Sequence, residues 1–108
     1  MFLELIKSQN YTDTVTLENA LHVAQWIEKE FPQVTVYIHG SVLRPELVHP
    51  GSDIDIAVKG LHDGDCSVLR KSVSKRFGFL KVDIRRFEEL DAYMKQKIED
   101  KGYRVRNE

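Results

Sequence analysis

The chain has 108 residues, of which 42% are hydrophobic and 31% are charged, a composition that excludes a disordered or fibrous protein. This length leaves room for one hydrophobic core, so we expect a single domain over residues 1–108. The formal net charge of −1 excludes a strong overall attraction to nucleic acid or to an anionic membrane, and no apolar run is long enough to cross a bilayer.

The charges are unevenly distributed along this nearly neutral chain. Residues 1–69 carry four basic and ten acidic side chains, whereas residues 70–86 carry seven basic side chains and one acid, Asp83. Such a basic run is more often a solvated helix face than an interface, although it can also steer polyanions. The single cysteine, Cys66, cannot form an internal disulfide, which favours a reducing compartment and predicts a cytoplasmic location.

The first helix is expected after about ten residues whose pattern is ambiguous. Thr14 or Thr16 can cap its start, because a threonine hydroxyl accepts a hydrogen bond from the first turn of a helix. Apolar side chains then recur at helical spacing as far as Glu30. Pro32 ends the pattern, because proline cannot continue a helix.

Two strands with a loop between them follow. Residues 34–39 are mainly β-branched and aromatic and predict a strand that stops at Gly40. Residues 41–52 contain two prolines and a glycine and predict a loop with room for one helical turn. Residues 53–58 alternate between polar and apolar side chains and then become apolar, which predicts a second strand.

The second half of the chain predicts two more helices and a third strand. Residues 66–77 have apolar side chains at helical spacing, and residues 79–84 form the strand. Residues 87–101 predict an amphipathic helix that ends at Gly102, followed by a short edge strand over 103–106. The order helix, strand, strand, helix, strand, helix describes an α/β or α+β domain with a small mixed β-sheet flanked by helices.

Three aspartates can carry chemistry. Asp53 and Asp55 are two apart on a strand, so their side chains leave one face about 7 Å apart, while Ile54 and Ile56 face the core. Carboxylates this close repel each other, and two divalent ions about 3.5–4 Å apart would satisfy both and clamp a phosphoryl displacement. Mg²⁺ or Mn²⁺ suits such oxygen ligands best. Asp83, between apolar residues on a neighbouring strand, can supply a third carboxylate and accept the proton of an attacking hydroxyl.

Gly40 and Ser41, where a strand meets a turn, have the features of a phosphate site. Glycine lets the backbone approach a phosphate closely, and serine offers a hydroxyl and an N–H group. If residues 41–46 form a helical turn, its N-terminus points at a triphosphate and Arg44 can reach a phosphate. Arg44 is also consistent with a solvated loop residue. His39 is consistent with a packed residue at the end of a strand or with a nucleotide contact.

The sequence contains three motifs in a fixed order: an apolar-Gly-Ser turn, an Asp-apolar-Asp strand after eleven residues, and a later apolar-Asp-apolar strand. This order resembles the DNA polymerase β-type nucleotidyltransferase superfamily. Residues 40–45 and 51–56 are most similar to its minimal nucleotidyltransferases, and the resemblance extends over residues 34–103. Leu43 and Pro45 stand where the loop of that family often has alanine and glycine.

The resemblance implies a nucleotidyltransferase fold, a site and an activity. Gly40 and Ser41 would cradle the triphosphate of ATP or another NTP, and Asp53, Asp55 and Asp83 would bind the metal ions. A nucleoside monophosphate, AMP where ATP is the donor, would move to an acceptor hydroxyl with release of pyrophosphate. Minimal nucleotidyltransferases are often paired with small helical HEPN-type proteins as toxin–antitoxin systems. The resemblance therefore implies an antitoxin that modifies a tyrosine of such a partner.

Two other functions are consistent with the sequence. The same fold can act as a non-catalytic binding or neutralising subunit, and the basic run over residues 70–86 can bind nucleic acid. The enzyme would need metal and both Asp53 and Asp55, whereas nucleic-acid binding would depend on salt and survive the loss of both carboxylates. A homo-oligomer is compatible with any of these functions.

Overall fold

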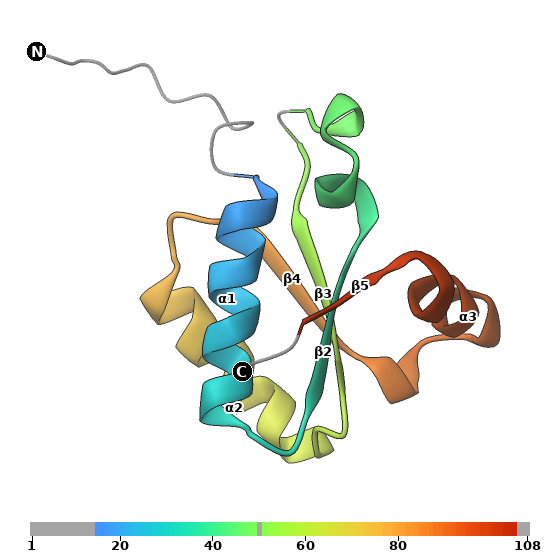
Figure 1. The fold of residues 1–108 in the computed structure, drawn as a ribbon. Helices are drawn as coiled ribbons and strands as arrows, with labels where there is room; N and C mark the ends of the chain where they lie inside the picture. The colour runs from blue at the N-terminus through green and yellow to red at the C-terminus, as the bar shows by residue number, and fades with distance from the viewer. Residues whose placement is uncertain (1–14, 50, 106–108) are drawn as a thin grey trace, which may run out of the picture.

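The computed structural model describes residues 15–49 and 51–105, which form a four-stranded mixed sheet with helices on both faces (Figure 1). The predicted fold class, an α+β domain with a small mixed sheet flanked by helices, is confirmed. The ambiguous first ten residues lie outside the described part of the chain. The helices and strands follow in the order α1 (Leu17–Glu30), β2 (Thr35–His39), β3 (Ile54–Lys59), α2 (Asp63–Arg76), β4 (Val82–Arg86), α3 (Ala92–Lys101) and β5 (Tyr103–Val105).

The order of the strands brings polar residues from three of them together. The sheet has the order β4–β3–β2–β5, with β3 and β4 parallel and the other neighbouring pairs antiparallel. α2 forms the crossover that the parallel pair requires. The register places His39 opposite Asp55, and Asp55 opposite Asp83. These three side chains therefore lie in one row across the sheet.

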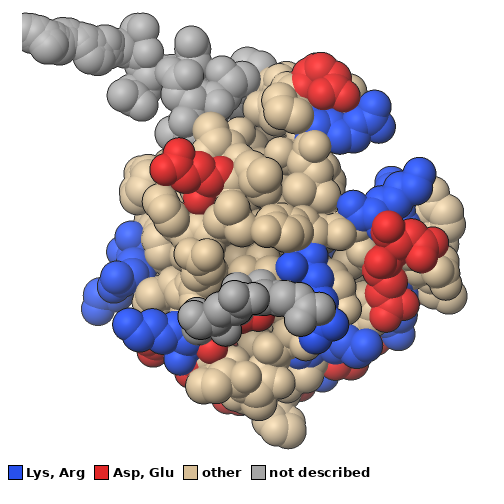
Figure 2. Space-filling view, viewed as in Figure 1, with Lys and Arg blue, Asp and Glu red and all other residues tan. Residues whose placement is uncertain are grey.

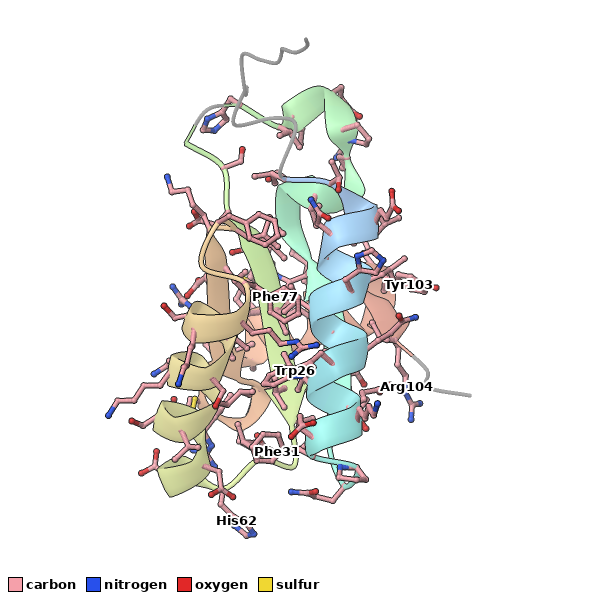
Figure 3. The ribbon with its side chains drawn as sticks, turned by 90° about the vertical axis from the view of Figure 1, so that its left-hand side faces the viewer. Trp26, Phe31, His62, Phe77, Tyr103 and Arg104 are labelled. Atoms are coloured by element: carbon pink, nitrogen blue, oxygen red, sulfur yellow. The ribbon has the colours of Figure 1, made fainter. Side chains whose placement is uncertain are left out.

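The larger hydrophobic core lies between the sheet and the helices α1 and α2. Alternate residues of β2 and β3 are fully buried in it: Val36, Ile38, Ile54, Ile56 and Val58. Each of these side chains contributes about 1.5–3 kcal/mol by leaving water. Figure 3 shows Trp26 of α1 facing Phe77 at the end of α2, with ring centroids 5.9 Å apart in an edge-to-face contact. Because strand side chains alternate, the row of polar residues faces the opposite side of the sheet.

α3 covers that opposite side only in part. Of its ten residues only Ile98 is buried, in a small second cluster where the rings of Tyr37 and Phe87 stack with centroids 5.7 Å apart. Leu90 and Met94 pack against this cluster but stay half-buried. The polar row is therefore left open to solvent on one side of α3.

α2 and β4 begin at residues other than those predicted. α2 starts at Asp63 rather than at residue 66, because its first turn carries two aspartates, and the free amide groups of a helix start favour negative charge. β4 starts at Val82 rather than at residue 79, because a turn closed by a hydrogen bond from the Leu80 amide precedes it. Both differences come from local interactions, charge at a helix start and a hydrogen-bonded turn, that apolar periodicity does not report.

α3 begins at Ala92 rather than at residue 87, because Asp91 caps it. The Asp91 carboxylate accepts a hydrogen bond of 2.8 Å from the Met94 amide. Replacing Asp91 with alanine removes the acceptor, so we expect the free energy of unfolding to fall by about 1 kcal/mol in urea denaturation. Asp100→Ala, in the exposed last turn of the same helix, is the control and should change stability by about 0.5 kcal/mol or less. Equal losses in both variants would contradict the capping role.

Candidate active site

The row formed by His39, Asp55 and Asp83 lies in a cleft of about 710 Å³. The turns that follow β2 form one side of this cleft, and α3 forms the other. Figure 2 shows this cleft as a hollow at the upper right, with Lys and Arg side chains on both sides of it. Five of the six site residues predicted from the sequence line the cleft: Gly40, Ser41, Arg44, Asp55 and Asp83. Residues separated by more than forty positions in the chain are therefore brought to one site.

Asp55 and Asp83 form the centre of the cleft. They are register partners on parallel strands, which lie about 4.8 Å apart. Burial of the half-buried Asp55 carboxyl, and then the charges of Asp83 and Asp53, raise the pKa of Asp55 from 3.8 to about 6. The positive charge of Arg85 opposes this increase only in part. Near neutral pH the site thus concentrates negative charge that a cation would neutralise.

Asp53 is the predicted site residue that the structure leaves at the margin. β3 begins at Ile54, so Asp53 precedes the strand, and it is not among the residues that line the cleft. Its charge is nevertheless close enough to raise the pKa of Asp55. The structure brings Asp55 and Asp83 together, and it places Asp53 near them but outside the cleft.

The carboxylates do not by themselves form a complete metal-binding site in the described part of the chain. Across residues 15–49 and 51–105, no three His, Cys, Asp or Glu side chains are grouped closely enough to hold a metal ion. Instead, the Oδ2 atom of Asp83 accepts a hydrogen bond of 3.1 Å from Arg85 Nε, and the two side chains form an exposed ion pair. Such a pair contributes about 0–1 kcal/mol, so a divalent ion can displace it. The donor set fits a hard cation, since Asp55 and Asp83 offer carboxylate oxygens from adjacent strands.

Gly40 holds the turn after β2 against Asp55. Its φ of +83° lies in the left-handed region that favours glycine, and a Cβ at this position would overlap the Asp55 carboxylate. A 3₁₀ turn runs from Gly40 to Leu43, and a second one from Pro45 to Leu47. Two short turns therefore replace the single helical turn expected here, because Pro45 has no N–H and starts a new turn.

Arg44 lines the cleft from the junction of these two turns. Its Nε atom pairs with Glu46 Oε2 at 3.1 Å, and both side chains are exposed. An exposed pair of this kind contributes about 0–1 kcal/mol and does not hold the guanidinium away from an anion. Arg44 is therefore placed where it can contact a ligand, although in this structure it contacts its own loop.

His39 is a lining residue that is not among the six predicted site residues. It stands beside Asp55 in the polar row and directly before Gly40. Burial lowers the pKa of His39, and the charges of Arg85 and Lys97 lower it further against the opposing effect of Asp83. The imidazole is therefore neutral near pH 7 and available as a hydrogen-bond donor or acceptor.

α3 contributes a second group of lining residues that the motifs did not indicate. Met94, Lys97, Ile98 and Lys101 line the cleft, and so does Leu90, just before the helix. The available signal was the combination of two lysines at i and i+4 with an apolar stripe on one helix. That pattern is ordinary for a surface helix, and only the packing of α3 shows which way it faces.

Part of the basic run between residues 70 and 86 is used in contacts within the fold. Arg70 donates two hydrogen bonds, of 3.0 and 2.8 Å, to the Ile84 carbonyl of the edge strand β4. Arg86 donates to a backbone carbonyl at 2.9 Å, and Arg76 lies over the ring of Trp26. These contacts occupy three of the seven cations on which a nucleic-acid surface would depend.

A second hollow, of about 390 Å³, adjoins the cleft. It shares Asp83, Arg85 and Leu90 with the cleft and is otherwise lined by Arg70 and Glu89. Asp83 therefore faces two spaces at once. A group that assists transfer between two bound molecules needs such a position.

Compared with known proteins, the chain matches no family model, and no curated protein matches it significantly. Within the part of the chain that the structure describes, no helix is both long enough and apolar enough to cross a membrane. We therefore infer the function from the residues and the geometry of the cleft.

Proposed function

We propose that this protein is a metal-dependent nucleotidyltransferase that moves a nucleoside monophosphate, AMP from ATP, to an acceptor hydroxyl. The observation that supports this most directly is the register pairing of Asp55 with Asp83 in the same cleft as the Gly40–Ser41 turn. Carboxylates suited to a cation and a turn suited to phosphate thus share one space. Its volume of about 710 Å³ falls in the range of small-molecule sites.

The three aspartates and the Gly40–Ser41 turn each have a role in this proposal. Asp55 and Asp83 would hold Mg²⁺ or Mn²⁺, with Asp53 as a further ligand at the margin. When bound, the cation neutralises charge on the triphosphate and on the leaving pyrophosphate. Gly40 and Ser41 would bind the triphosphate through backbone amides and the serine hydroxyl.

The transfer itself needs a proton acceptor beside the acceptor molecule. Asp83 faces both the cleft and the adjoining hollow, so its carboxylate would take the proton of an acceptor hydroxyl bound in that hollow. The acceptor oxygen would bond to the α-phosphorus, the bond from that phosphorus to the bridging oxygen would break, and pyrophosphate would leave. Arg85 must release Asp83 for this role, which the exposure of their ion pair permits.

The motif resemblance to minimal nucleotidyltransferases extends the proposal to an acceptor. A tyrosine hydroxyl on a small helical HEPN-type partner would receive the nucleotide, and the chain would act as the antitoxin of that pair. A reducing, cytoplasmic location fits this role, and Cys66 is buried and unpaired.

The test is transfer of label from ATP in the presence of cell lysate. We expect label from the α-phosphate to appear on a macromolecule with Mg²⁺, and not with EDTA or with the Asp53→Ala/Asp55→Ala variant. Adding the protein should not increase the transfer of γ-label above the level that the lysate alone gives, because pyrophosphate carries that label away. An increase in γ-label that depends on the added protein would identify a kinase instead. The absence of α-label transfer with every NTP would reject the enzyme.

A non-catalytic neutralising subunit is the second candidate, and the ion pair between Arg85 and Asp83 favours it. Arg85 pairs with one oxygen of Asp83 at 3.1 Å, so this carboxylate has a cationic partner that is not a metal ion. This candidate predicts a partner complex that forms equally well with EDTA and with the Asp53→Ala/Asp55→Ala variant. Size-exclusion chromatography with the captured partner distinguishes the two functions.

A further inference from the structure

The last turn of α3 is held next to the turn that follows β2. Gly102 directly after α3 has an ordinary φ of −73°, but a Cβ there would lie 2.6 Å from the Ile98 carbonyl oxygen and 3.3 Å from the Ile38 carbonyl oxygen. Tyr103, the next residue, pairs with Ile38 in the register of β2 and β5. Because Gly102 has no side chain, the end of α3 can pack against Ile38 of β2, which lies two residues before Gly40.

Two lysines of α3 line the cleft at this end. Lys97 and Lys101 are one helical turn apart, and the charge of Lys97 acts on His39, the residue before Gly40. Two arginines also line the cleft, but each is paired with a carboxylate, Arg44 with Glu46 and Arg85 with Asp83. Neither lysine forms an ion pair with an acidic side chain in the described part of the chain. The cleft thus contains two ammonium groups whose charge is available to a ligand.

The character of α3 changes along its length. Leu90, just before the helix, lines both hollows together with Asp83, and Met94 follows in the first turn. The basic residues Lys97 and Lys101 follow toward the end that meets the Gly40 turn. A ligand with an apolar group at one end and several negative charges at the other matches this order.

We propose that Lys97 and Lys101 form a phosphate subsite that binds the β- and γ-phosphates of the nucleotide across the cleft from the Gly40–Ser41 turn. The assignment of the ligand as a nucleotide rests on the proposed function. The lysine ammonium is a compact charge that commonly binds phosphate, and two of them offset most of the charge of a terminal diphosphate. The α-phosphate then lies nearer Asp55 and Asp83, and the nucleoside nearer Leu90 and Met94.

The test compares ligands that differ only in these phosphates. Isothermal titration calorimetry with Mg²⁺ gives the dissociation constants of ATP, tripolyphosphate and AMP for the full chain and for Lys97→Ala/Lys101→Ala. We expect the double substitution to weaken ATP and tripolyphosphate roughly 10- to 100-fold, as expected for two lost charge-assisted contacts, and AMP less than about 2-fold. Lys97→Arg/Lys101→Arg, which keeps both charges, should recover most of the affinity for ATP.

The matched control is Lys71→Ala/Lys75→Ala. These two lysines have the same spacing and are exposed on α2, away from the lining of the cleft. The control should leave all three dissociation constants within about 2-fold, because it removes the same net charge at a distance that salt screens. An equal loss in the control, or an equal loss for AMP and ATP, would overturn the subsite.

The results also separate the subsite from the proposed function. Loss of tripolyphosphate binding in the α3 variant without any α-label transfer by the wild type would establish the subsite and reject the transferase. Active transfer with ATP affinity unchanged in the α3 variant would reject the subsite alone. A wild-type chain that binds none of the three phosphates would reject both. Circular dichroism of α3 variants confirms that each is folded.

Discussion

Replacing Asp55 with asparagine is expected to stabilise the metal-free protein at neutral pH. The pKa of Asp55 is raised from 3.8 to about 6 in the folded chain, so the folded state binds its proton more tightly than the unfolded state does. Ionisation of Asp55 therefore destabilises the fold progressively as pH rises from about 4 to about 6, and fully above that. Only well below the unfolded pKa of 3.8 is the carboxyl protonated in both states, and there it has no effect.

Because Asp55 is half exposed, solvent screening reduces the gain, and we expect Asp55→Asn to add about 1 kcal/mol at pH 7.5. For a domain of this size that raises Tm by about 4 °C. Thermal unfolding in EDTA at pH 7.5 and at pH 4 checks the prediction, and most of the gain should be lost at pH 4. Asp100→Asn, on the exposed face of α3 outside the cleft, should show no such dependence. A gain of equal size at both pH values would contradict the electrostatic cause.

The same substitution should remove activity. Asp55→Asn takes a charged ligand from the cation, and we expect kcat/KM for α-label transfer to fall by about 10³-fold or more. Mg²⁺ should raise the Tm of the wild type by binding the folded state, and it should raise the Tm of Asp55→Asn much less. A residue that destabilises the fold while it supports activity is kept for function. A purely structural carboxylate would show losses in both stability and activity.

The fold was predictable because its signals are local. Helical spacing and a threonine cap defined α1, whose Thr16 hydroxyl accepts a hydrogen bond of 3.1 Å from Asn19 as expected. Alternation placed Ile54 and Ile56 in the core, where both are fully buried. The errors arose where a hydrogen-bonded cap or turn overrides apolar spacing, as Asp91 does before α3.

The candidate site was predictable only where one strand or turn carries it. Gly40 and Asp55 were each indicated by a motif on its own element, and the register of β2 and β3 brings the two together. The ion pair of Arg85 with Asp83 was not anticipated, although the two residues are two apart on β4 and so share a face. The sequence did not indicate that Lys97 lines the cleft, because it does not say which face of α3 turns toward the sheet. Tertiary packing determines that face.

Gly40→Ala is expected to have the largest effect on stability among the turn residues, and Gly60 provides a matched control. Both glycines have φ in the left-handed region, +83° and +92°, so alanine costs about 1–2 kcal/mol at either position. At Gly60 the added Cβ meets its nearest atom, the Gln33 carbonyl oxygen, at an ordinary 3.5 Å. At Gly40 the added Cβ overlaps a carboxylate oxygen of Asp55, and the Cγ atom of Asp55 would lie only 3.3 Å from that Cβ.

We therefore expect urea denaturation to give a loss of about 2–4 kcal/mol for Gly40→Ala against about 1–2 kcal/mol for Gly60→Ala. The difference reports the contact with Asp55, and a double-mutant cycle isolates it. In an Asp55→Ala background the carboxylate is gone, so Gly40→Ala should cost no more than Gly60→Ala does. Equal losses for both glycines in the wild-type background would mean that only backbone conformation selects Gly40. A coupling of about 1 kcal/mol or more would instead show that the turn after β2 and the Asp55 carboxylate are built as one unit, which is what a site joining a phosphate turn to a cation ligand requires.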